Sequence, residues 1–336
     1  MTPPPLLEVR SVTTEVEIGD RHWPVVDGVS FTIGRGEVVG LVGESGSGKS
    51  MTARTILRLL PAEARTRGMI LLDGVDLLSL PRRALRGVRA RRIAMIFQDP
   101  RAHIDPLWTS GDHVTEGLRV NGGLSGAVAR ARARELLADV GILEAERVLG
   151  AYPGELSGGM LQRVMIAGAL AAEPELLIAD EPTTALDVTV QAEIVAIFDG
   201  LRRERELAML FITHDLELAS SLCDRVLVMY AGRVMEEQPT SALFSAPLHP
   251  YTAGLLEARP TLETKHVRLS VIPGRPPTPT DPPDGCPFHP RCAFVEPACI
   301  SAVPPLRQLA GAAFSACRRT EEIRDRLRPE AMAGRG

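Results

Sequence analysis

The most constraining feature of this chain is the stretch GESGSGKS, Gly43 to Ser50, which lies between an apolar strand-like run and a helical run. It matches the phosphate-loop pattern, in which glycines let successive backbone N–H groups turn toward phosphate oxygens. Lys49 would supply a positive charge to the β- and γ-phosphates, and Ser50 a hydroxyl to Mg²⁺. We therefore predict a nucleotide site formed by Gly43, Ser45, Gly46, Gly48, Lys49 and Ser50.

The rest of the pattern predicts an α/β fold with a largely parallel sheet. Short apolar, β-branched runs alternate with helical stretches, as expected when helices cover both faces of a sheet. We expect strands at 37–42, 176–179, 209–213 and 225–229.

Two departures from this alternation divide the chain. Residues 99–165 are richer in helical patterns and predict a helical insertion, with one amphipathic helix at 127–140 whose buried face holds Val128, Leu136, Leu137 and Val140. Later, the proline-rich stretch 272–285 predicts an extended connector, because proline cannot donate to a sheet ladder. We expect a nucleotide-binding domain over 1–245 and a smaller C-terminal extension over 246–336.

Composition limits the possible partners. The net charge of −4 gives no general basic field for nucleic acid. The N-terminus lacks a signal-peptide pattern, and no apolar run approaches the roughly 18 residues that a membrane-spanning helix needs. Any role at a membrane is therefore expected to be peripheral.

Two further motifs fit nucleotide chemistry. In ELLIADEP, an apolar strand ends in Asp180, which can hold Mg²⁺ through water, and Glu181, which can polarise an attacking water as general base. In LSGGMLQR, Ser157, Gly158 and Gly159 begin a helix whose hydroxyl, amides and dipole suit an anion. Because the phosphate loop already binds one nucleotide, this second anion site is expected to serve the ATP of a partner subunit.

With these motifs in this order, residues 6–240 resemble the nucleotide-binding subunits of ABC transporters, a P-loop NTPase (RecA-like) fold with a helical subdomain. The resemblance implies a Q-loop residue, Gln98, that contacts Mg²⁺ and the attacking water, and a D-loop over 183–187 that includes Asp187. It also implies a switch histidine, His214, that holds the γ-phosphate. ATP and Mg²⁺ are the implied cofactors, and two such subunits would enclose two ATP molecules.

One position departs from the family pattern. An aromatic residue is usually found about 25 positions before the phosphate loop, where it stacks on adenine, but Val16 stands there. Trp23 lies nearby and could substitute, although its pattern favours a buried core side chain.

The tail carries the second resemblance. The stretches HPYTAGLLEARP (249–260), IPGRPP and GCPFHPRC resemble the C-terminal extension of ATPases that drive oligopeptide, dipeptide and nickel importers. In that group four cysteines can hold a [4Fe–4S] cluster, which here implies Cys286, Cys292, Cys299 and Cys317. Four thiolates are a suitable ligand set, and cysteines in a reducing compartment stay available. Cys223 stands alone in the main body.

Two alternatives at the cysteines stay open. Zinc, with His289 in place of one cysteine, is the main one. Structural zinc uses pairs separated by about two to four residues, whereas five, six and seventeen residues separate successive cysteines here. Free or disulfide-linked thiols are the other.

The expected function is that of an ATPase subunit that energises import of peptides, nickel or another small solute from the cytoplasmic face of the membrane. The implied partners are a second ATPase subunit, in this family usually a paralogue, two permease subunits and an extracytoplasmic solute-binding protein, with no nucleic acid. A nucleic-acid- or ribosome-associated ABC ATPase is the alternative class, but such proteins usually carry two cassettes or a long coiled coil. Export of a solute, instead of import, is a less favoured variant of the transport function.

Overall fold

The computed structural model describes residues 3–184, 186–258 and 271–328. Ala185, in the predicted D-loop, and residues 259–260, at the end of the HPY stretch, lie outside these ranges. The chain divides into two compact units, each built from segments distant in sequence. The first contains Met1–Glu8, Thr32–Val38 and Ile70–Thr213, and the second contains Val9–Phe31, Val39–Met69 and His214–Gly336.

In the first unit, three parallel strands form the centre. They are β6 (Ile93–Ile96), β7 (Leu176–Asp180) and β8 (Ala208–Thr213), paired in the order β6, β7, β8. All residues of β7 and β8 are buried, as expected for parallel strands covered on both faces. The end of β4 (Arg65–Leu72) also pairs here with the short β5 (Val75–Asp76).

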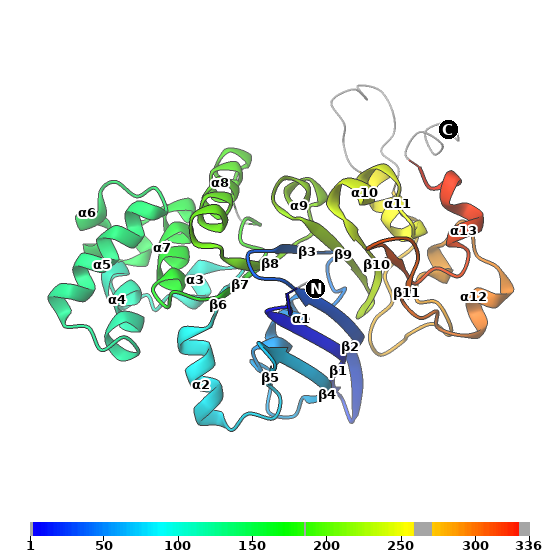
Figure 1. Cartoon of the computed structure of the whole chain (residues 1–336), viewed down its shortest axis with the longest axis horizontal. Coiled ribbons are helices and arrows are strands. Elements are labelled where there is room, and N and C mark those ends of the chain that lie inside the picture. Colours follow the sequence, from blue (N-terminus) through cyan, green and yellow to red (C-terminus); the bar gives the residue numbers. More distant parts are fainter. Residues whose placement is uncertain (1–2, 185, 259–270, 329–336) are drawn as a thin grey trace. The chain divides into compact units, whose positions relative to one another are not determined.

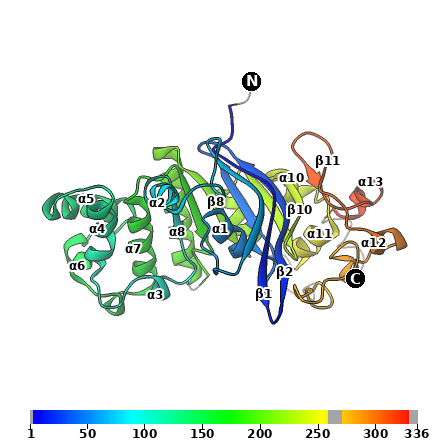
Figure 2. The ribbon, with the colours of Figure 1, turned by 90° about the horizontal axis from the view of Figure 1, so that it is seen from below.

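The helices of this unit fill most of the remaining sequence. The stretch predicted as a helical insertion contains α3 (Pro100–His103), α4 (Ser110–Val120), α5 (Gly126–Asp139), α6 (Ala145–Gly150), the 3₁₀ helix η1 (Pro153–Glu155) and α7 (Gly158–Leu170). The helices α4 to α7 lie side by side in both views (Figures 1 and 2). Two more helices belong to the unit, α2 (Arg82–Arg91) and α8 (Val188–Arg205).

One part of the predicted amphipathic face is wrong. In α5, Leu136 and Leu137 are fully buried, and Val140 at the helix end is also buried, but Val128 is 53% exposed. The buried stripe is continued toward the N-terminus by Ala129 and Ala133 instead. Small alanines at this position allow α5 to pack closely against α4 and α7.

In the second unit, the strand before the phosphate loop, β3 (Val38–Val42), pairs in parallel with β9 (Arg225–Tyr230), and β10 (Arg233–Pro239) returns antiparallel to β9. Every residue of β3 is buried. The long strands β1 (Leu7–Ile18) and β2 (Arg21–Ile33) are neighbours and belong mostly to this unit. Two helices complete this part, α1 (Lys49–Ile56) and α9 (Leu216–Leu222).

The C-terminal extension adds to the same unit rather than standing apart from it. The short strand β12 (Phe314–Ser315) pairs antiparallel with β10 and with β11 (Arg307–Gln308). Helices α10 (Thr240–Ser245), α11 (Pro250–Glu257), α12 (Pro297–Ser301) and α13 (Thr320–Ile323), with the 3₁₀ helices η2 (His289–Arg291) and η3 (Arg324–Arg326), lie around these strands. Residues 272–285 contain no helix or strand, as predicted from their prolines.

Within the described ranges, no helix is both long enough and apolar enough to cross a membrane.

Candidate functional site

The phosphate loop joins the end of β3 to the start of α1, as its sequence predicts. Lys49 is the first residue of α1 and is only 4% exposed. Its Nζ atom donates to the carbonyl oxygens of Gly43 at 2.8 Å and Glu44 at 3.0 Å. The lysine charge is therefore held inside the loop, beside the N-terminus of α1, where a helix dipole also attracts anions.

Two glycines of the loop are required by its surroundings. At Gly43, an added Cβ atom would lie 2.1 Å from the carbonyl oxygen of Met229. Gly48 caps α1 with a φ of 102°, a conformation that favours glycine, and a Cβ there would lie 2.7 Å from the Val25 carbonyl oxygen. The loop packs against its neighbouring strands too closely for any side chain at either position.

The acidic motif lies in the first unit, at the end of β7. Asp180 is the last residue of that strand and is 2% exposed. Glu181 follows with a φ of 47°, an uncommon conformation for a residue other than glycine, and its N–H donates to the Ile212 carbonyl oxygen at 3.0 Å. Such backbone strain often occurs at functional positions, where the surrounding structure maintains it.

The structure brings two of the predicted catalytic residues together. Gln98 follows β6, and its Nε2 atom donates to Oε2 of Glu181 at 3.0 Å. The hydroxyl of Thr184 donates to the same oxygen at 2.8 Å. Sequence reasoning placed Thr184 in the D-loop but missed this contact, which depends on the turn that follows β7. The two donors fix the direction in which the carboxylate points.

The signature motif begins a helix, as predicted. Ser157 is the N-cap of α7, and its hydroxyl accepts from the Met160 N–H at 3.3 Å. Asp187 caps α8 in the same way and accepts from the Val190 N–H at 3.0 Å. Gly158 and Gly159 are the first residues of α7. Ser157 and Asp187 thus begin two helices of the first unit, in addition to any role at a nucleotide.

The remaining predicted residues belong to the second unit. His214 directly follows β8, is exposed, and stands before Asp215, which caps α9. Val16 lies on β1 and Trp23 on β2. The prediction that Trp23 is a buried core side chain is wrong, because it is only partly buried. Trp23 lies near the start of β2, where the burial pattern is mixed.

A second site, entirely within the second unit, is formed by the tail cysteines. Cys286, Cys292, Cys299 and Cys317 all line one pocket, together with the rings of His249, Phe288, His289 and Phe294. They come from four different positions: before η2, at the end of η2, within α12 and after β12. A hydrogen bond of 2.8 Å from the Cys286 N–H to the Cys299 carbonyl oxygen links two of these segments.

Burial dominates the acid–base behaviour of these thiols. It raises the pKa of Cys286 to about 11 and that of Cys292 to about 12, and it also raises the pKa of Cys317. Repulsion between neighbouring thiolates adds to each of these shifts. In the free protein these three thiols, Cys286, Cys292 and Cys317, therefore keep their protons at neutral pH, and binding of a metal by their thiolates would release protons.

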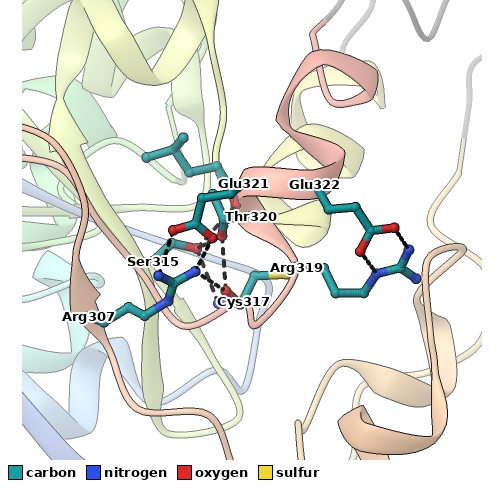
Figure 3. A network of polar contacts seen from close by, with 8 residues as sticks. Arg307, Ser315, Cys317, Arg319, Thr320, Glu321 and Glu322 are labelled. Atoms are coloured by element: carbon teal, nitrogen blue, oxygen red, sulfur yellow. Dashed lines mark hydrogen bonds and ion pairs between the residues drawn. The ribbon is translucent and has the colours of Figure 1, made fainter.

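Polar contacts hold the backbone of Cys317 in place (Figure 3). Its N–H donates to the Ser315 hydroxyl at 3.2 Å, and its carbonyl oxygen accepts from the Thr320 hydroxyl at 3.0 Å and from Arg307 at 3.4 Å. Arg307 also pairs with Glu321. Among the residues that the structure describes, however, no three or more His, Cys, Asp or Glu side chains converge closely enough to hold a single metal ion.

Two regions of the chain match known protein families. Residues 26–184 match the ABC transporter family, and residues 235–299 match the family described as oligopeptide/dipeptide transporter, C-terminal region. The oligopeptide transport ATP-binding protein OppD of Salmonella typhimurium (strain LT2) is 45% identical over 312 residues, which cover 93% of this chain and 93% of that protein. OppD of Haemophilus influenzae (strain Rd) is 44% identical over 295 residues, or 88% of this chain and 91% of that protein.

A solved structure gives the same result for the fold. The dimeric post-hydrolysis state of the ATP-binding cassette MJ0796, bound to ADP and Pi, is 31% identical, with a TM-score of 0.63 over 70% of this chain and 98% of that one. The chain therefore belongs to the ABC transporter family of ATP-binding proteins. Within that class it is the ATPase subunit of an importer, with the extension found in oligopeptide and dipeptide transporters.

Proposed function

We propose that this subunit energises the import of peptides. The observation that carries the proposal is the match of residues 235–299 to the oligopeptide/dipeptide transporter C-terminal region. Relatives that align over nearly the whole chain and are named for oligopeptide transport support it. Nickel or another small solute is the alternative cargo.

The assembly that we propose has two ATPase subunits, of which the second is a paralogue, on two permease subunits at the cytoplasmic face of the membrane. An extracytoplasmic solute-binding protein would deliver the cargo. The ATPase domain would span 1–245, with its helical subdomain at about 99–165, and the extension 246–336.

We assign the steps of hydrolysis as follows. The amides of the phosphate loop and Lys49 bind the phosphates, and Ser50, Gln98 and Asp180 are the groups that would hold Mg²⁺. Glu181 accepts the proton of the attacking water, and His214 holds the γ-phosphate. Ser157, Gly158 and Gly159 complete the site on the ATP of the partner subunit, and Asp187 lies in the D-loop beside it. The capped start of α7 supports this, because the N-terminus of a helix attracts anions.

The cargo can be tested in cells that lack the gene for this subunit. Loss of uptake of a labelled tripeptide, with nickel uptake unchanged, supports peptide import. If peptide uptake is unchanged and nickel uptake is lost, the transported solute is nickel rather than peptides. Glu181→Gln, which removes the proposed base, serves as the matched inactive subunit, and co-purification with the permeases tests the assembly.

At the cysteine pocket we propose a [4Fe–4S] cluster held by Cys286, Cys292, Cys299 and Cys317. The donor set fits, because all four thiols line one pocket and a cluster takes each cysteine on a different iron. Zinc is the alternative, but structural zinc usually takes pairs of ligands separated by about two to four residues, whereas five, six and seventeen residues separate successive cysteines here. When bound, the cluster would cross-link segments beside a small apolar cluster formed by Ala253, Phe294, Ile323 and Leu327, against which Cys292 and Cys317 pack.

Anaerobic purification tests the cluster. Protein with the cluster should be brown and contain about four irons per chain, and Cys292→Ser should bleach it. Cys223→Ser is the matched control, because Cys223 lies outside the pocket. If the anaerobic protein is colourless and contains one zinc per chain, the cysteines form a zinc site and the cluster assignment is wrong.

A further inference from the structure

Glu44, the second residue of the phosphate loop, is bound by an arginine of the C-terminal extension. Nη1 of Arg291 lies 2.6 Å from Oε2 of Glu44, and Nη2 lies 3.0 Å from Oε1. The arginine side chain is only 4% exposed and that of Glu44 26%. A two-point guanidinium–carboxylate pair that is shielded from water is among the stronger polar contacts in proteins.

The extension and one aromatic side chain hold Arg291 in this position. Its Nε donates to the Pro273 carbonyl oxygen at 2.9 Å, and Nη2 donates to that of Ile272 at 3.3 Å. Nη1 also donates to the Tyr230 hydroxyl at 3.3 Å. Arg291 directly precedes Cys292, so the residue that holds the phosphate loop is next in sequence to a residue of the cysteine pocket.

A second extension residue holds the backbone of the same glutamate. The N–H of Glu44 donates to the Tyr251 hydroxyl at 2.9 Å. Tyr251 begins α11 with Pro250 and is fully buried. Its ring packs against Tyr230 at 4.6 Å and Phe288 at 5.3 Å between centroids. The side chain and the main chain of Glu44 are thus held by two segments of the extension that are 40 residues apart.

The charge of Glu44 gives this arrangement a consequence for ATP. A carboxylate in a phosphate-binding loop repels the phosphates, and the repulsion is strong where water is partly excluded. The guanidinium of Arg291 neutralises that carboxylate. Removing the arginine leaves an uncompensated negative charge within the loop that must bind three phosphates.

We propose that the C-terminal extension positions and neutralises the phosphate loop through Arg291 and Tyr251, so that ATP affinity at this subunit's own loop depends on the extension. Both are positioning residues that act through Glu44. The inference rests on the ATPase activity of the chain. It does not depend on which solute is transported or on which group the cysteines bind.

The test is a titration of the purified full chain with MgATP at low temperature, where hydrolysis is slow. Arg291→Ala should weaken binding by about tenfold or more. Glu44→Gln added to Arg291→Ala should restore most of the affinity, because it removes the unpaired charge. Tyr251→Phe, which keeps the ring but removes the acceptor, should weaken binding by only a few-fold. In steady-state assays, KM for ATP should change more than kcat.

Arg225→Ala is the matched control. Arg225 forms a similarly buried pair with Glu237 at the start of β9, whereas Arg291 contacts Tyr230 at the other end of that strand. This variant should lose stability without losing ATP affinity. Equal loss of affinity in Arg225→Ala and Arg291→Ala, or no restoration by Glu44→Gln, would overturn the proposal. If Arg291→Ala does not fold, Arg291→Gln replaces it, because glutamine keeps hydrogen-bond donors but removes the charge, and unchanged MgATP affinity in that variant would overturn the proposal.

Discussion

The carboxylate of Glu181 accepts a hydrogen bond from the side-chain amide of Gln98, with 3.0 Å between Oε2 and Nε2. The Q-loop and the acidic motif are 83 residues apart in sequence, yet a single contact joins them. This hydrogen bond therefore helps to fix the orientation of the proposed general base.

Glu181→Gln should leave ATP binding intact and lower turnover by about 10² or more, because the amide keeps the shape of the side chain but cannot accept the proton. ATP should then hold the dimer closed. The steady-state ATPase rate of the reconstituted complex is the measurement. An unchanged rate would show that Glu181 is not the general base.

Two substitutions should separate a subunit's own nucleotide from that of its partner. Lys49→Ala removes the charge within the phosphate loop and should abolish binding there. Ser157→Arg places a bulky side chain at the start of α7 and should spare that binding while it impairs the site on the partner's ATP. Nucleotide binding is measured on isolated subunits, and ATPase rates on dimers that contain one mutant subunit. Together the two measurements distinguish the effects of the two substitutions. Loss of a subunit's own nucleotide in Ser157→Arg contradicts the shared site.

Gly159→Ala should destabilise the first unit, because the added Cβ would lie 2.7 Å from Cγ1 of Val190. The expected loss is about 1–3 kcal/mol in the free energy of unfolding, as for other overpacked contacts. Adding Val190→Ala should recover much of it. Gly154→Ala is the control, since nothing lies within 4 Å of its added Cβ. Urea unfolding measures the wild type and the three variants, and equal stabilities would show that α7 can move away from Val190.

Stability should fall as the pH rises toward neutrality because of Glu236. Burial raises the pKa of this carboxyl from 4.5 to about 7, although the N–H groups of Leu248 and His249 donate to it at 2.8 Å and act in the opposite direction. The folded state thus binds the proton more tightly than the unfolded state. The stabilisation is complete below pH 4.5 and is lost as the pH passes through 7, by up to roughly 3 kcal/mol.

Glu236→Gln should remove this part of the pH dependence in thermal unfolding between pH 5 and 8. The exposed Glu204→Gln should leave the dependence unchanged. If Glu236→Gln and the wild-type protein lose stability in parallel over this range, Glu236 is not the group responsible.

Local features were predicted well from the sequence. The four strands expected at apolar runs were found with ends within one residue of those predicted, because fully buried strands read as continuous apolar stretches. The cap at Ser157 follows from local hydrogen bonding and was predicted for the same reason. The pairing of Gln98 with Glu181 could only be placed once the strands β6 and β7 were seen to be neighbours.

Features that depend on distant segments could not be predicted. No local pattern distinguishes Arg291 from the other arginines of the chain, and its partner Glu44 is 247 residues away. The exposure of Val128 and the incomplete burial of Trp23 were also missed, because apolar periodicity does not say which neighbours a helix or strand will have. The short strands β11 and β12 contain too few residues to show the alternation of apolar and polar side chains by which a strand is predicted.

The pairing of β12 with β10 has a practical consequence for anyone who shortens this protein. The contact opposes Glu236 to Ser315 and Glu237 to Phe314, and the Ala316 N–H donates to the Met235 carbonyl oxygen at 2.8 Å. Deleting everything after residue 245 would strip these partners from β10 and leave an open strand edge, which invites pairing with other chains. Preparations cut at that point are expected to aggregate even though every ATP motif is intact, so the minimal catalytic fragment must keep its last strands.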